Sequence, residues 1–270
     1  MTAPSDTLSP ADADAISQAP NHGTNRPKRP AKNIPLPEPI AFEAPFPNRK
    51  TIRSWLIPLG GRSTARALLL FAFDYALFAA VLAGVVLASP WWAKVGLGVL
   101  AGLIIARLFI IGHDACHQSL TDRRGLNKWL GRLTFLPSLT PYSLWEVGHN
   151  VVHHGYTNLK GFDFVWAPYS LEEFRALPRS RRILERIYRN GLGAGLYYLI
   201  EIWWFKLFFP SKRQMATRRP IFMWDCALVG AFGAVWIGAL VWLAVATGQS
   251  PLLLVGTGFV LPFLIWNATV

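Results

Sequence analysis

Apolar residues in this chain fall into long runs, and nothing in it has the period-2 alternation of a β-sheet. Residues 66–88 form a first run that is interrupted only by Asp74, and residues 91–111, 221–247 and 251–270 form three more. Each run reaches the ~18 apolar residues that indicate a membrane-spanning helix. The pattern predicts an all-α integral membrane helical bundle with four transmembrane helices.

The connections between the runs are short. Ser89 and Pro90 separate the first two runs, and residues 248–250 separate the last two. Such short turns force consecutive helices to run antiparallel, so the sequence predicts two helical hairpins. The segment between the hairpins, residues 112–220, is mixed in character and is expected to form a cytoplasmic or interfacial helical cap. Within it, residues 195–209 are apolar and aromatic, which is typical of a helix lying in the membrane interface.

The N-terminal segment has a different composition. Residues 1–60 contain eleven of the twenty prolines and no apolar stretch long enough for the core of a signal peptide. This composition predicts a disordered, Pro-rich, basic cytoplasmic tail. Residues 61–270 are then expected to form the membrane domain.

The overall composition agrees with a membrane protein. Apolar residues make up 52% of the chain and charged residues 16%, against about 25% charged in ordinary soluble domains. The formal charge is +12, and nine Lys or Arg fall in residues 1–66 and sixteen in residues 112–220. By the positive-inside rule both segments are expected to be cytoplasmic, in a bacterial inner membrane. The charge thus reflects topology, and we expect no nucleic-acid partner.

The chemistry of the chain is concentrated in its histidines. Five of the six lie within 42 residues, in the motifs HDACH and HNVVHH: His113, His117, His149, His153 and His154. On an α-helix, residues four apart share a face, so His113 and His117 form one predicted pair, and His149 and His153 form another. His154 is expected to point about 100° further round. Such an imidazole cluster suits iron, copper or zinc, and the sixth histidine, His22, is given no role.

Polar and aromatic neighbours of these motifs are candidates for supporting roles. Asp114, Asn150 and Asp163 are candidate partners that orient the imidazoles, although exposed carboxylates are the ordinary alternative for the two aspartates. Trp145, Tyr142 and Tyr156 are candidates for the lining of an acyl channel, with interfacial aromatic residues as the alternative.

The segments GHDACHQSL and WEVGHNVVHHGYTNLKGFD resemble the first and second histidine boxes of the membrane fatty acid desaturase family. The resemblance covers residues 65–270, including the order of spans and boxes. It implies a non-haem di-iron centre, with two Fe ions, that uses O2 to remove hydrogen from an acyl chain in the membrane. The five clustered histidines are the positions to which the ligand roles carry over. The resemblance also implies an external, ferredoxin-like electron donor.

The family pattern includes a third box of HxxHH type after the fourth span, and this sequence has no further histidine. The domain is therefore expected to be C-terminally incomplete, and the chain alone is expected to be inactive. Three alternatives stay open at this point. One is a lipid or carotenoid hydroxylase with the same di-iron site, and the others are a haem-binding electron-transfer membrane protein and a non-catalytic membrane scaffold.

Overall fold

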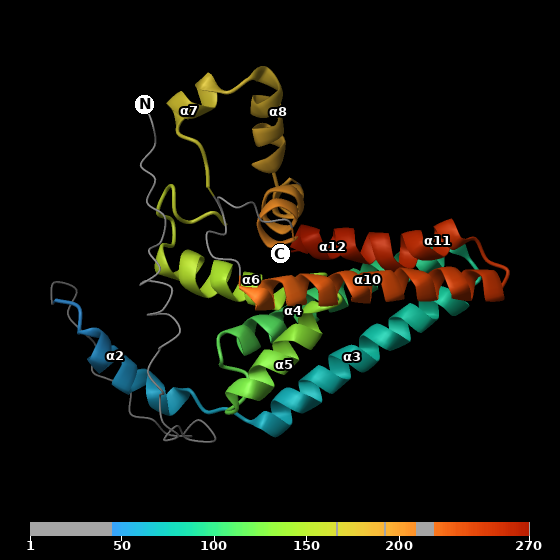
Figure 1. Cartoon of the computed structure of the whole chain (residues 1–270), viewed down its shortest axis with the longest axis horizontal. Helices are drawn as coiled ribbons and strands as arrows, with labels where there is room; N and C mark the ends of the chain where they lie inside the picture. The colour runs from blue at the N-terminus through green and yellow to red at the C-terminus, as the bar shows by residue number, and fades with distance from the viewer. Residues whose placement is uncertain (1–44, 166, 192, 209–218, 270) are drawn as a thin grey trace.

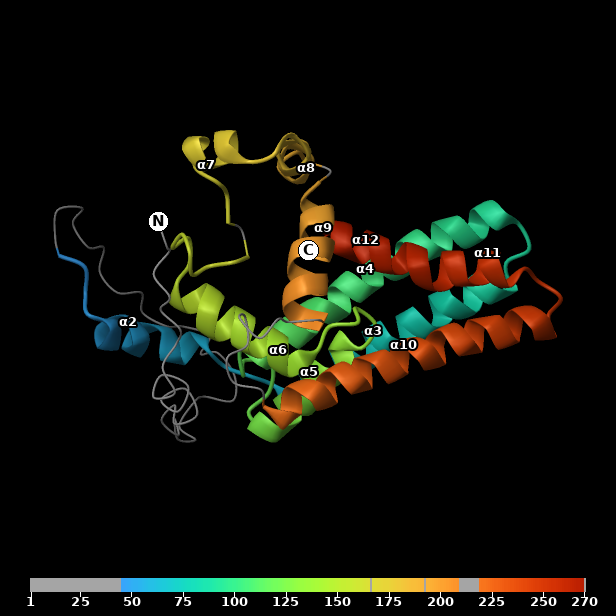
Figure 2. The ribbon, with the colours of Figure 1, turned by 45° about the horizontal axis from the view of Figure 1, so that its top comes forward.

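The computed structural model describes residues 45–165, 167–191, 193–208 and 219–269, and within these ranges the chain is helical and contains no strand. Four helices in the described ranges are long and apolar enough to cross a membrane. They are α3 (Thr64–Leu87), α4 (Trp91–Cys116), α10 (Pro220–Ala246) and a fourth that comprises α11 (Pro251–Val255), η4 (Gly256–Val260) and α12 (Leu261–Thr269). The prediction of an all-α bundle with four membrane-length helices is confirmed (Figures 1 and 2).

A buried lysine joins the two predicted hairpins at the end of the bundle where their turns lie. Lys94 Nζ donates hydrogen bonds to the carbonyl of Val85 (2.6 Å) and to Gln249 Oε1 (2.6 Å). Gln249 Nε2 in turn donates to the carbonyl of Val86 (3.0 Å). These bonds satisfy carbonyls at the C-terminus of α3, which have no partner inside their own helix. We call the opposite end, where α4 finishes in HDACH, the box end.

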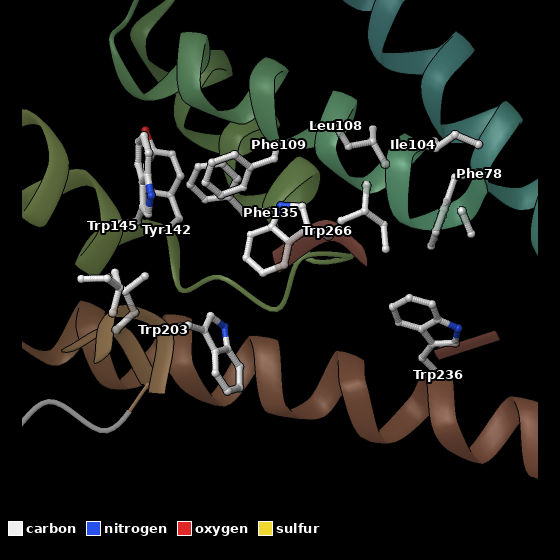
Figure 3. Close-up of a cluster of buried hydrophobic side chains, with 14 of the residues drawn as sticks. Phe78, Ile104, Leu108, Phe109, Phe135, Tyr142, Trp145, Trp203, Trp236 and Trp266 are labelled. Carbon is white, nitrogen blue, oxygen red and sulfur yellow. The ribbon is translucent and has the colours of Figure 1, made fainter. Parts of the chain in front are cut away.

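Helix α4 is the centre of the bundle because glycines let the fourth span approach it closely. A Cβ on Gly98 would lie 2.4 Å from the carbonyl oxygen of Thr257, and one on Gly102 would lie 2.6 Å from Ile265 Cβ. Toward the box end, aromatic rings fill the core between helices (Figure 3). Phe109 stacks on Phe135 with ring centroids 4.7 Å apart, and Trp266 lies 5.4 Å from Phe109.

The cap consists of short helices between the two hairpins. Its elements are α5 (Arg124–Phe135), α6 (Tyr142–Glu146), η2 (Val147–His153), α7 (Leu171–Ala176), α8 (Arg179–Tyr188), α9 (Ala194–Tyr197) and η3 (Tyr198–Phe208). The α9–η3 helix is seen end-on in Figure 1 while α10 lies in the plane, so it runs across the bundle rather than along it. Ile202 and Leu207 are buried, whereas Trp204 and Phe205 are exposed. This placement agrees with the interfacial helix expected over residues 195–209.

The N-terminal segment differs in part from the expected tail. Residues 1–44 lie outside the described residues, but Arg49–Leu56 form helix α2 and Ile57–Leu59 a short 3-10 turn. Asn48 caps α2, because its side-chain oxygen accepts a hydrogen bond from the backbone N–H of Thr51 (3.0 Å). Such a cap favours a helix start. The disordered tail predicted to reach residue 60 therefore does not extend over residues 49–59.

Candidate metal centre

The first histidine pair lies at the C-terminal end of α4. His113 is in the last turn of the helix and His117 is its C-cap residue. Their Nε2 atoms are 3.2 Å apart, as the four-residue spacing predicts for one helical face. His113 Nδ1 lies 3.2 Å from Asp114 Oδ1, but the Asp114 side chain is 51% exposed. That contact is therefore weakened by water.

The second motif lies on a π-helix, and this changes which histidines pair. Residues Val147–His153 form η2, whose wider turn brings residues five apart onto one face. His149 Nε2 consequently lies 3.1 Å from His154 Nε2. The expected pairing of His149 with His153, and the expected rotation of His154 away from them, assumed an α-helix and are corrected here. π-Helical turns frequently occur at functional sites.

The two motifs converge. Ring centroids lie 4.9 Å apart for His113 and His149 and 4.8 Å apart for His117 and His154. His153 borders the group, with its ring 5.4 Å from that of His149. One ring nitrogen from each of His113, His117 and His149 lies within 4.8 Å of the others. Nitrogens bound to one ion at about 2.0–2.1 Å are separated by roughly 3 Å when at right angles, so the observed spacings fit shared metal ions.

Asp163 fixes the orientation of His153. Both carboxylate oxygens contact His153 Nδ1, at 3.0 and 3.1 Å. The same carboxylate accepts backbone N–H groups from Asn158 (3.0 Å) and Val165 (3.1 Å). Burial alone would raise the pKa of Asp163, but these donors hold it below its usual value. An ionised carboxylate accepts the Nδ1–H, which leaves the Nε2 lone pair of His153 free for a metal.

Two of the imidazoles, those of His149 and His117, favour the neutral state that metal binding requires. Burial, together with the neighbouring imidazoles, lowers the pKa of His149 to about 3. Burial also lowers the pKa of His117, and His113 and His154 add to that effect. At neutral pH both rings are therefore uncharged, and their lone pairs are not blocked by additional protons.

Polar bonds hold the two box-bearing helices together. Asn150 Nδ2 donates to the carbonyl of Cys116 (3.0 Å), which links η2 to the end of α4. Asn150 thus contacts the helix end next to His117, and no contact of its side chain with an imidazole is found in the described residues. At the start of α6, Asp225 of α10 accepts from Arg132 Nε (2.8 Å) and from the backbone N–H of Ser143 (2.9 Å). These bonds anchor the cap to the spans.

A largely apolar cavity of about 180 Å³ opens beside the histidines. Its lining includes His113, His149 and His153 and the following residues of other elements: Phe109, Trp145, Gly148, Phe164, Val165, Tyr198, Ile202 and Leu207. Trp145 stacks on His149, with ring centroids 4.1 Å apart. Of the three aromatic residues suggested for an acyl channel, Trp145 lines this cavity. Tyr142 is instead buried in the core, and Tyr156 stacks on Phe162 away from the cavity.

Sequence reasoning missed part of this lining. Phe109 lies near the end of the second predicted span, and Tyr198, Ile202 and Leu207 lie in the predicted interfacial segment. No motif in either segment indicated a functional site. Their spacing of four and five residues along α9–η3 is the signal that could have grouped them on one face. Only the crossing of that helix over the box end brings them to the histidines.

Comparison with known proteins identifies the origin of this arrangement. The family model described as "Fatty acid desaturase" matches residues 89–270, which include both boxes and three of the four spans. The chain belongs to the fatty acid desaturase family. With its four membrane-length helices, this desaturase-family chain is a membrane protein.

Individual relatives agree with the family assignment. The chain is 27% identical over 167 residues to an sn-1 oleoyl-lipid 12-desaturase of Arthrospira platensis, which covers 57% of this chain and 47% of the relative. It is 32% identical over 162 residues to a chloroplastic omega-6 fatty acid desaturase of Arabidopsis thaliana (57% and 35%). It is 28% identical over 149 residues to an sn-1 acyl-lipid omega-3 desaturase (ferredoxin) of a Synechocystis strain (55% and 41%). The alignments thus span less than half the length of these relatives.

Proposed function

We propose that the protein carrying this chain desaturates a fatty acyl chain of a membrane lipid in an O2-dependent reaction at a non-haem di-iron centre. The convergence of five imidazoles at the box end, three of which line an apolar cavity, carries the proposal; they belong to His113, His117, His149, His153 and His154. The relatives, which are named as lipid and fatty acid desaturases, suggest the reaction type.

The residues of the chain would divide the work as follows. The five histidines would provide ligands to two Fe ions, with Asp163 holding His153 in the tautomer that binds metal. Iron held there would supply the power to oxidise an unactivated C–H bond with O2. Phe109, Trp145 and Ile202 would position a segment of the acyl chain against the histidines and exclude water. The cavity is smaller than the ~300 Å³ of typical ligand pockets, so it would hold part of the chain.

The reaction also needs electrons and protons from outside the membrane. Removing two hydrogens from adjacent methylenes while O2 becomes two waters requires two further electrons and two protons. A ferredoxin-like carrier is the proposed donor, because one relative is named as a ferredoxin-dependent desaturase. Such a carrier is water-soluble and needs an accessible box end. The basic residues of the cap support a box end on the cytoplasmic side, and the membrane proposed is a bacterial inner membrane.

The alternatives fit the geometry less well. Imidazole nitrogens 3.1–3.2 Å apart leave no room for a porphyrin between them, which argues against a bis-histidine haem. A scaffold role gives no reason for five converging imidazoles. A lipid or carotenoid hydroxylase would use the same site, and the desaturase names of the relatives favour desaturation over it.

Gas chromatography of cellular lipids tests this proposal. The full-length protein, expressed with a ferredoxin and its reductase, should introduce a double bond into acyl chains only when O2 is present. His153→Ala should abolish the product, because loss of one ligand impairs both metal affinity and geometry. His22→Ala, which changes the one histidine of the 270-residue sequence outside the two motifs, is the control and should leave the product unchanged. Hydroxylated lipid without new unsaturation would replace desaturation by hydroxylation.

A further inference from the structure

An arginine on α4 faces outward from a membrane-spanning helix. Arg107 Nε and Nη2 both donate to the same oxygen of Asp74 on α3, at 3.1 and 2.9 Å. The Asp74 side chain is buried, whereas that of Arg107 is 54% exposed. Within the described part of the chain, Nη1 has no protein hydrogen-bond partner. One edge of the guanidinium is therefore held by protein and the other edge is presented outward.

The surroundings of Arg107 are those of a lipid-facing surface. Leu100, Leu103 and Ile110 are exposed on the same face of α4 as Arg107. The fourth span packs on the opposite face, where Gly98 and Gly102 lie. The cavity and the histidines also lie away from Arg107, so this residue belongs neither to the candidate metal centre nor to its substrate lining.

The depth of Arg107 places it within reach of lipid phosphates. The exposed Trp91 marks the start of α4 at one membrane border. Arg107 follows sixteen residues later, about 24 Å along the helix at 1.5 Å per residue. The hydrocarbon core is about 30 Å thick, so the guanidinium lies a few ångströms inside the box-side border. Because Asp74 holds the guanidinium at this depth, local thinning of the bilayer would have to bring the lipid phosphate inward to it.

We propose that Arg107, oriented by Asp74, binds the phosphate of a phospholipid in the box-side leaflet. Asp74 neutralises the guanidinium, but the N–H donors of Nη1 would have no acceptor in hydrocarbon, which is costly, and phosphate oxygens match these planar donors. The exposed leucines and isoleucine on the same helix face would contact the acyl chains of that lipid. Asp114 lies seven residues further along this face, about 10 Å away, and therefore weakens the attraction without occupying the guanidinium.

Thermal stability of the purified chain in maltoside detergent is the first test. Phosphatidylglycerol should raise the Tm of the unaltered protein, whereas a phosphate-free galactosyl diacylglycerol should not. The double variant Asp74→Asn with Arg107→Gln removes the ion pair without leaving a buried charge, and it should lose the shift. Lipid phosphorus retained after purification should also fall by about one phosphate per chain, as expected for one charge-assisted site. Arg175→Gln, in an exposed position of the cap, is the control and should retain both effects.

A single conservative variant tests the geometry if the double variant does not fold. Arg107→Lys keeps the positive charge, but its one ammonium group is engaged by Asp74, so the shift with phosphatidylglycerol should fall at least about threefold. An undiminished shift in this variant or in the double variant would refute the proposal. Equal stabilisation by the galactolipid would also refute it. If the variants instead dissociated a dimer on size exclusion while retained phosphorus stayed constant, Arg107 would contact a second copy of the chain and not a lipid.

Discussion

The bond between Asp163 and His153 gives the sharpest test of the candidate metal centre. Asp163→Asn replaces one acceptor oxygen by an amide group while keeping the size of the side chain. The backbone N–H groups of Asn158 and Val165 donate to different carboxylate oxygens, at 3.0 and 3.1 Å, so the amide oxygen keeps only one of these two bonds. The amide then presents N–H to His153 Nδ1. The imidazole must move its proton to Nε2, which blocks the nitrogen that would bind metal.

The size of the effect follows from the role of such partners. Loss of a carboxylate that orients a ligating histidine typically costs 10- to 100-fold in metal affinity, which corresponds to about 1.4–2.7 kcal/mol. Asp114→Asn is the matched control. It changes the same group beside His113, but the Asp114 side chain is half exposed and its contact is a single one of 3.2 Å. We expect less than about a threefold loss there.

Competition between the purified protein and a chelator for Fe(II), followed by metal analysis, measures both constants. Circular dichroism at each step verifies that the variants remain helical. The reasoning fails if folded Asp163→Asn binds iron as tightly as the unaltered protein. It also fails if Asp114→Asn loses as much affinity as Asp163→Asn, because burial would then not distinguish the two carboxylates.

Three further predictions follow from the structure. Gly98→Ala should lower the thermal unfolding temperature in detergent, at a cost of about 1–3 kcal/mol of stability, because its Cβ would meet the Thr257 carbonyl oxygen at 2.4 Å. Gly96→Ala is the control and should leave that temperature unchanged, because its Cβ would meet nothing within 4 Å. Equal effects of the two variants would contradict the close approach of α4 and η4. The pKa of His149 is lowered to about 3 in the folded state, from an ordinary value near 6.5, so between these pH values the unfolded state binds more protons than the folded state. The metal-free protein should therefore lose stability as pH falls from 7 to 4. In denaturation curves, His149→Gln should flatten this pH dependence. Cysteines introduced at Arg175 and Thr247 should be labelled from opposite sides of the membrane, and labelling of both from the cytoplasm would exclude the four-span topology.

The amino-acid sequence determined much of this protein without reference to its structure. Runs of about twenty apolar residues can satisfy their backbone polar groups in a bilayer only as helices or closed barrels, so the four spans and their short turns could be predicted from the pattern. The His113–His117 pair could be predicted as well, because α4 is α-helical from His113 to Cys116 and His117 follows as its C-cap residue. These features depend on local periodicity, which a sequence displays directly.

Other features depended on tertiary structure. The pairing of His149 with His154 requires the π-helical turn of η2, and the hydrophobic pattern of the sequence does not distinguish a π-turn from an α-turn. The cavity needs the α9–η3 helix to cross the box end, so that Ile202 and Leu207 meet Trp145 from more than fifty residues away. Asp163 could be suggested from sequence as a partner, but only the loop that returns it to His153 distinguishes it from the exposed Asp114. In each case the deciding contact joins residues whose relative placement is set by packing between elements, and local periodicity carries no information about that packing.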